Sequence, residues 1–251
     1  MSIEIDILLP AFIAGLLVLA THIPFGMRIL QRGVIFADLA VAQVAGLGVM
    51  AGELLGLLER PVLVQLIAAG SALLGAALLA WIDRSLPQVK EAAIGLTFVL
   101  AASSGILLLA HDPHAGEHLQ DLLAGQILWV GTTQLLTTAL LTTVLLAFWY
   151  GLRQRSGDLG FYALFALAVT ASVQLVGVYL VFASLIVPAL ATHRISSQRM
   201  RHAFAIGIAG YALGLLSSVW FDLPAGAAIV WALALAGLPY GILKSRDQRN
   251  I

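Results

Sequence analysis

Long apolar runs separated by short polar segments occupy almost the whole chain. A membrane-spanning helix needs roughly 17–25 mainly apolar residues, and seven separate runs reach that length. They cover residues 7–30, 34–58, 61–82, 92–110, 131–150, 203–221 and 225–243. This pattern predicts an all-α, polytopic integral membrane protein, in which one helical bundle accounts for residues 1–251 as a single transmembrane domain.

One further apolar run, residues 160–193, is too long for one ordinary span and short for two. The basic residues decide this case, because Lys and Arg accumulate in short cytoplasmic loops. A single crossing would put the basic clusters before and after the run on opposite sides, whereas two crossings with a turn near Gly177 keep them together. We therefore predict eight or nine helices, with nine crossings preferred, the N-terminus outside and every basic residue except Arg60 in the cytoplasm.

Composition agrees with this picture and excludes several classes of protein. Of the 251 residues, 61% are hydrophobic and 10% charged, whereas soluble domains have about a quarter charged residues. The 13 Lys and Arg balance the 13 Asp and Glu, which argues against a nucleic-acid partner. Because cysteine is absent, a metal site must use His and carboxylate ligands. No phosphate-binding P-loop motif occurs, so ATP would be bound only by a partner subunit.

Two ionisable side chains, Asp38 and His22, are singled out as candidates inside the predicted spans. Asp38 is the only acid well inside an apolar run, and such a residue is a functional candidate because burying it is costly. The basic loop runs from Arg28 to Arg32 between two antiparallel helices. His22 lies six residues before it and Asp38 six residues after it, so we expect the two side chains at similar depths in the membrane. Carboxylate and imidazole suit divalent first-row cations. The two form either a metal site or a mere buried polar pair.

The polar segment 111–121 contains three of the six histidines and no Lys or Arg, and it is predicted to lie outside. Asp112 followed by Pro113 is typical of a helix start, and Gly125 of a helix end. On such a helix two of the histidines share a face with a nearby carboxylate, a ligand set that zinc or manganese accepts. The candidate metal ligands are His111, His114, His118 and Glu117.

Other interpretations of this segment are open. In one, the segment is a solvated polar helix at the membrane surface; in another, it docks a metal-carrying protein. The spacing of His114, Glu117 and His118 also satisfies the signature of the inverted zinc proteases. An intramembrane hydrolase is the least favoured interpretation, because a loop of this size offers neither a scaffold nor a third ligand.

Several short motifs together resemble the membrane permease subunits of zinc and manganese ABC importers, the ABC-3 group. The resemblance spans nearly the whole chain, and its motifs are specific only in combination. They are residues 9–15 (LPAFIAG), Arg32 with 36–38 (FAD), 91–96 (EAAIGL), 122–125 (LLAG), 176–180 (VGVYL), 184–189 (SLIVPA) and 222–226 (DLPAG).

The resemblance implies a multi-pass permease of the bacterial plasma (inner) membrane, assembled as a homodimer or pair. It also implies two cytoplasmic ABC ATPase subunits and an extracytoplasmic metal-binding protein. Asp38 matches the acid of the family's second helix, but Ala42 stands where the family has a histidine. Either His22 or Gln43 compensates, or the substrate is neither zinc nor manganese. Since the loop at 153–158 is shorter than the family's docking segment, residues 193–201 are the alternative contact for the ATPase.

We therefore expect a permease subunit, not an enzyme and without a cofactor of its own, that moves a divalent metal ion inward by alternating access. An ATP-independent metal channel or secondary carrier is the alternative.

Overall fold

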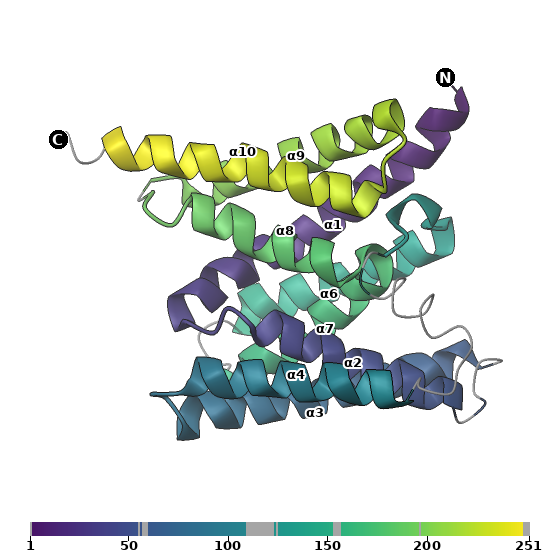
Figure 1. Cartoon of the computed structure of the whole chain (residues 1–251), viewed down its shortest axis with the longest axis vertical. Helices are drawn as coiled ribbons and strands as arrows, with labels where there is room; N and C mark the ends of the chain where they lie inside the picture. The colour runs from purple at the N-terminus through teal and green to yellow at the C-terminus, as the bar shows by residue number, and fades with distance from the viewer. Residues whose placement is uncertain are drawn as a thin grey trace. The chain divides into compact units, whose positions relative to one another are not determined.

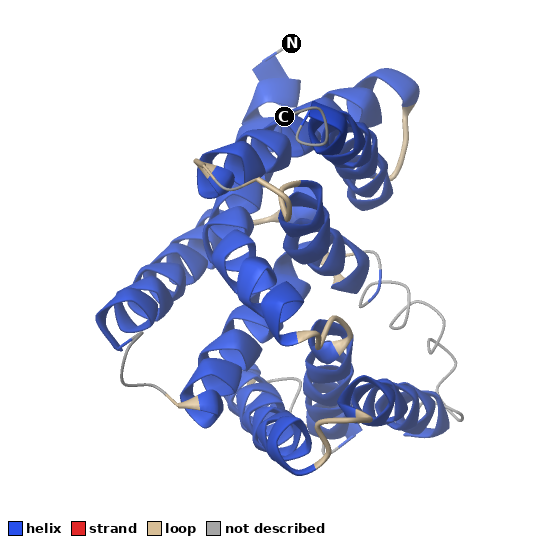
Figure 2. Ribbon diagram, turned by 90° about the vertical axis from the view of Figure 1, so that its left-hand side faces the viewer, coloured by secondary structure: helices blue, strands red, loops and turns tan. Residues whose placement is uncertain are grey.

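A computed structural model describes residues 2–54, 56, 60–108, 123, 125–152, 157–195 and 197–247. Within these ranges the chain is all-α, with nine α-helices, one 3₁₀ helix and no strand (Figures 1 and 2). The elements are α1 (Ser2–Arg32), α2 (Ala37–Leu54), α3 (Pro61–Ser85), α4 (Lys90–Leu108), η1 (Ile127–Trp129), α6 (Thr132–Leu152), α7 (Asp158–Val176), α8 (Val178–Ala191), α9 (Arg199–Phe221) and α10 (Ala225–Asp247).

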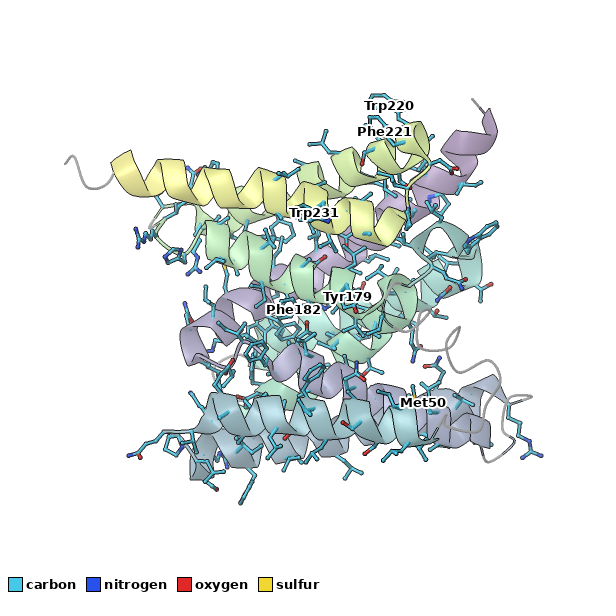
Figure 3. The ribbon with its side chains drawn as sticks, in the orientation of Figure 1. Met50, Tyr179, Phe182, Trp220, Phe221 and Trp231 are labelled. Atoms are coloured by element: carbon cyan, nitrogen blue, oxygen red, sulfur yellow. The ribbon has the colours of Figure 1, made fainter. Side chains whose placement is uncertain are left out.

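The helices have the length and surface of membrane spans. Six of those in the described ranges are long and apolar enough to cross a bilayer, namely α1, α3, α4, α6, α7 and α9. Large apolar side chains stand on their outer faces: Leu74 and Leu107 are 74% exposed and Trp220 is 75% exposed. In Figure 3, Trp220 and Phe221 lie at the end of α9 and Trp231 lies on α10. A surface of this kind suits lipid, which confirms the predicted helical membrane bundle.

The apolar run 160–193 is divided where the charge argument placed its turn. Helix α7 ends at Val176 and α8 begins at Val178, and Gly177 between them has a φ of 78°. An L side chain rarely adopts this φ, so glycine is the residue that interrupts the run at little conformational cost. The division into two helices is confirmed, and the two crossings remain a prediction.

The chain folds into two compact units, each built from segments distant in sequence. The first unit comprises Met1–Arg32, Leu123–Val144 and Gln174–Ile251. The second comprises Gly33–Leu122 and Leu145–Val173.

Glycines bring the helices of the first unit together. Helix α1 packs against α8 and α9, and α9 packs against α10 (Figure 1). Gly210 and Gly214, one turn apart on α9, face Leu233 and Ile229 of α10 so closely that a methyl group on either glycine would overlap its neighbour. This small-x-x-x-small pair therefore serves packing within one chain.

The second unit is organised around α2, which packs against both α3 and α4. A Cβ added at Gly48 would lie 2.5 Å from the Ser71 hydroxyl of α3, and one at Gly52 would touch Val64 of the same helix. Small residues again let backbones approach, and this second glycine pair is also intrachain packing.

Candidate ion-pathway residues

Asp38 is buried at the very start of α2 and has no hydrogen-bond partner among the described residues. It is the second residue of the helix and is 1% exposed. Neither of its carboxylate oxygens receives a hydrogen bond in the part of the chain that the structure describes. Buried polar groups are nearly always partnered, and an exception calls for an explanation. A bare carboxylate in this position can accept a cation.

The first turn of α2 is held by a residue from another helix. Gly33, with a φ of 65°, turns the chain after α1, and the Phe36 amide donates a 3.1 Å hydrogen bond to Oε1 of Glu91 on α4. An acid near a helix N-terminus would ordinarily bond its amides, but here Glu91 does so and Asp38 is left unbonded. Asp38 was expected well inside a span beginning near residue 34. Because the turn at Gly33 delays the helix to Ala37, Asp38 lies in its first turn instead.

His22, on α1, is buried with one ring nitrogen bound and the other free. It is 1% exposed, and its Nδ1 lies 3.0 Å from the Val18 carbonyl oxygen and 3.0 Å from the Thr21 hydroxyl. Nε2 is buried and has no partner among the described residues. His22 belongs to the first unit and Asp38 to the second, and their pairing stays a prediction.

The other candidate ligands lie outside the described residues. This holds for His111, His114, His118 and Glu117, so their metal binding stays a prediction. Among the described residues, no group of three or more His, Asp or Glu side chains is placed to hold a metal ion. Ala42 and Gln43, which follow Asp38 on α2, are both buried.

Sequence reasoning missed an ionic network in the second unit. Asp83, near the end of α3, accepts hydrogen bonds from Lys90 Nζ (3.1 Å) and the Tyr162 hydroxyl (3.0 Å). Arg84 next to it donates to Asp158 at 3.2 Å. Asp83 and Lys90 carry opposite charges seven residues apart, which is a sequence signal for their pairing. No local signal indicated that Tyr162 of α7 would also bond Asp83.

The loop between α8 and α9, predicted to contact an ATPase, carries cations and no acid. Arg194 Nε donates to Nε2 of His193 at 3.2 Å, and Arg199 donates to the Ala189 carbonyl at 3.2 Å, which ties the start of α9 to the end of α8. On the next turn of α9, His202 Nδ1 lies 2.9 Å from the Tyr240 hydroxyl of α10. The start of α9 is thus tied to both α8 and α10, and the loop before it presents the positive charge of Arg194.

Comparison with known proteins identifies the family. The model of the ABC 3 transport family matches residues 4–155 and 146–242. A solved structure described as PsaBC from Streptococcus pneumoniae in complex with Fab superimposes with a TM-score of 0.73, at 23% sequence identity, over 93% of this chain and 89% of that chain. At this identity the structural likeness supports the fold, while the family model spans most of the sequence. The chain therefore belongs to the ABC 3 transport family and is a multi-pass membrane permease of an ABC transporter.

Proposed function

We propose that this permease carries a divalent metal ion, zinc or manganese, inward across the bacterial plasma membrane by alternating access. An extracytoplasmic binding protein delivers the ion, and a cytoplasmic ATPase supplies the energy. Family membership supports the transport class, and the buried side chains support the chemistry of the cargo.

The observation that carries this proposal is the bare carboxylate of Asp38. Removing an unpaired carboxylate from water is expensive, with an effective penalty of several kcal/mol even after the protein relaxes. A structural acid avoids the penalty through hydrogen bonds or a neighbouring cation, and no described residue gives Asp38 a hydrogen bond. A divalent cation passing beside it would supply the missing charge. Because the ion must also be released, a site with a single carboxylate suits transport better than a full set of protein ligands that would hold the ion tightly.

His22 adds a second kind of ligand, a neutral imidazole nitrogen that has no partner among the described residues. An imidazole ligand favours first-row divalent cations over alkali ions. We assign both residues to the transport pathway, each as a transient ligand.

The partners follow from charge and from the family. The cationic loop between α8 and α9, with Arg194 and Arg199, offers a cytoplasmic contact for the ATPase. A second copy of this chain would complete the membrane part of the transporter, in the manner implied by the family. The segment with His111, His114 and His118 is the proposed receiving site on the outer side.

ATP-driven uptake in proteoliposomes tests the proposal. The full chain, co-purified with its ATPase and supplied with its binding protein, should take up Zn²⁺ or Mn²⁺ only with ATP. Asp38→Asn keeps the shape of the side chain but removes its charge, and we expect uptake to fall roughly 100-fold, the kinetic equivalent of losing a buried charge interaction. Asp158→Asn, at a partly exposed ion pair, is the matched control and should retain full uptake.

Two results would overturn the proposal. Uptake that proceeds equally without ATP would establish an ATP-independent channel or carrier. Normal uptake by Asp38→Asn, with the protein folded, would remove this carboxylate from the pathway.

A further inference from the structure

The hydrogen bonds around His22 favour one of its two neutral tautomers, even though the Thr21 hydroxyl, 3.0 Å from Nδ1, could donate to that nitrogen in the other. The Val18 carbonyl oxygen can only accept, and it lies 3.0 Å from His22 Nδ1 and 3.1 Å from the Thr21 hydroxyl that donates to it. If Nδ1 carried no proton, its lone pair would face this oxygen, and an N–H at Nε2 would be buried without an acceptor. With the proton on Nδ1, the carbonyl is satisfied by two donors. Nε2 is then left with a lone pair.

The main chain around His22 is held in place by close helix contacts on both sides. One turn before it, Leu19 packs against Gly207 of α9, where a Cβ would lie 2.7 Å from the leucine side chain. One turn after it, Gly26 approaches the Leu185 carbonyl of α8 so closely that no side chain fits. The three residues share one face of α1, because helical neighbours recur every three to four positions. The ring is therefore carried on a rigid part of the first unit.

This arrangement distinguishes His22 from the other described histidines. His193 is exposed and accepts a hydrogen bond from Arg194, and His202 pairs with Tyr240. In the described ranges, only His22 has a ring nitrogen that is both buried and unpartnered. Metal-binding histidines show the same pattern, in which the nitrogen that does not bind the metal donates to a backbone carbonyl.

We propose, as an extension of the proposed function, that His22 Nε2 is a selectivity ligand for the transported ion. A neutral nitrogen ligand binds Zn²⁺, Co²⁺ and Ni²⁺ in preference to Mn²⁺, and strongly in preference to Mg²⁺ and Ca²⁺, which favour oxygen. Asp38 attracts any divalent cation, whereas His22 selects among them. The Val18 carbonyl and the Thr21 hydroxyl orient the ring without touching the ion.

The ratio of Zn²⁺ to Mn²⁺ uptake tests this assignment. In His22→Leu, we expect the ratio of initial rates to fall about tenfold, the scale on which a metal site responds to the loss of a supporting interaction. His22→Gln, which stays polar, should lower the ratio in the same direction and covers the case in which the leucine variant does not fold. The control is Thr170→Val on α7, which removes a buried threonine hydroxyl that donates to the Ala166 carbonyl and not to the His22 ring; it should keep the ratio within about twofold.

A second readout does not depend on transport. In full-length protein labelled with ¹⁵N-histidine in nanodiscs, the signal lost in His22→Leu should be that of an unprotonated Nε2, and Zn²⁺ should shift it. His193→Gln should leave that signal unchanged. A protonated Nε2, or a signal insensitive to Zn²⁺, would overturn the assignment.

The outcomes separate this inference from the proposed function. If the wild type shows no ATP-driven uptake, the proposed function fails, and the Zn²⁺-induced shift still decides whether His22 binds metal. If Asp38→Asn abolishes uptake but His22→Leu leaves the Zn²⁺ to Mn²⁺ ratio unchanged, the proposed function stands and the role of His22 is refuted.

Discussion

Two aspartates of the second unit, Asp38 at the start of α2 and Asp83 near the end of α3, occupy opposite chemical situations. Both are removed from solvent: Asp38 is 1% exposed, and the Asp83 side chain is 13% exposed. Asp83 accepts from Lys90 and from the Tyr162 hydroxyl. Asp38 accepts no hydrogen bond from any described residue, although it lies in the first turn of a helix whose backbone amides could donate to it.

The difference separates an acid with hydrogen-bond partners from one that has none among the described residues. A buried polar group with its full set of partners adds to stability, while one without partners lowers it. Asp83 links α3 to both α4 and α7 and so supports the fold of its unit. We expect Asp38 to weaken the same unit, a cost that the transport role proposed for it would explain. The two acids should therefore respond in opposite ways to the same substitution.

The largest expected effect on stability is that of Asp83→Leu. This change leaves the half-buried Lys90 ammonium without its carboxylate, and we expect the free energy of unfolding to fall by about 2–3 kcal/mol. Reversible unfolding in mixed detergent micelles measures the change. The double variant Asp83→Leu/Lys90→Leu should recover much of the loss, since it also removes the positive charge that Asp83 neutralises. A loss that the second substitution leaves untouched would refute the ionic explanation.

The same substitution at Asp38 should act in the other direction. Asp38→Leu removes a buried carboxylate that has no hydrogen bond, and we expect a gain of about 1–2 kcal/mol in the free energy of unfolding. Uptake should be lost at the same time. Thermal unfolding followed by intrinsic tryptophan fluorescence gives the stability. If Asp38→Leu destabilises the protein as much as Asp83→Leu does, the contrast between the two acids disappears.

Removing one hydroxyl from the network should have a smaller effect. Tyr162→Phe keeps the ring against its aromatic neighbour Phe161 but deletes the hydrogen bond to Asp83. We expect a loss of about 1 kcal/mol, the usual contribution of one hydrogen bond. Because Lys90 still pairs with Asp83, uptake should stay near the wild-type level. An unchanged melting temperature would show that the hydroxyl contributes nothing to this unit.

The smallest effect is expected at the neighbouring exposed pair. The Arg84 and Asp158 side chains are 60% and 39% exposed, and water screens such pairs. Arg84→Met should change the free energy of unfolding by less than about 0.5 kcal/mol. Raising the salt concentration should abolish even this difference. A loss comparable to that of Asp83→Leu would show that the ionic network works as one unit.

The positions of the helices were predictable because hydropathy is a local property. The apolar runs correspond to helices throughout the described ranges, and the charge argument located the interruption at Gly177. The start of α2 was expected near residue 34 and lies at Ala37, because the apolar run continues through the turn at Gly33. The depth of Asp38 in the membrane stays a prediction. The pairing of His22 with Asp38, and the metal ligands in the segment 111–118, stay predictions.

By itself, the sequence determined the class of protein, the order of its helices and the two residues whose burial needs an explanation. These features follow from the local distribution of apolar and ionisable side chains. The tertiary structure decided which ionisable groups have hydrogen-bond partners. The Tyr162 hydroxyl donates to Asp83, 79 positions away in the sequence, and the Phe36 amide near Asp38 donates to Glu91. The reason is physical. A hydrogen bond needs two groups within about 3 Å of each other, and only the folding of distant helices against one another brings them to that distance.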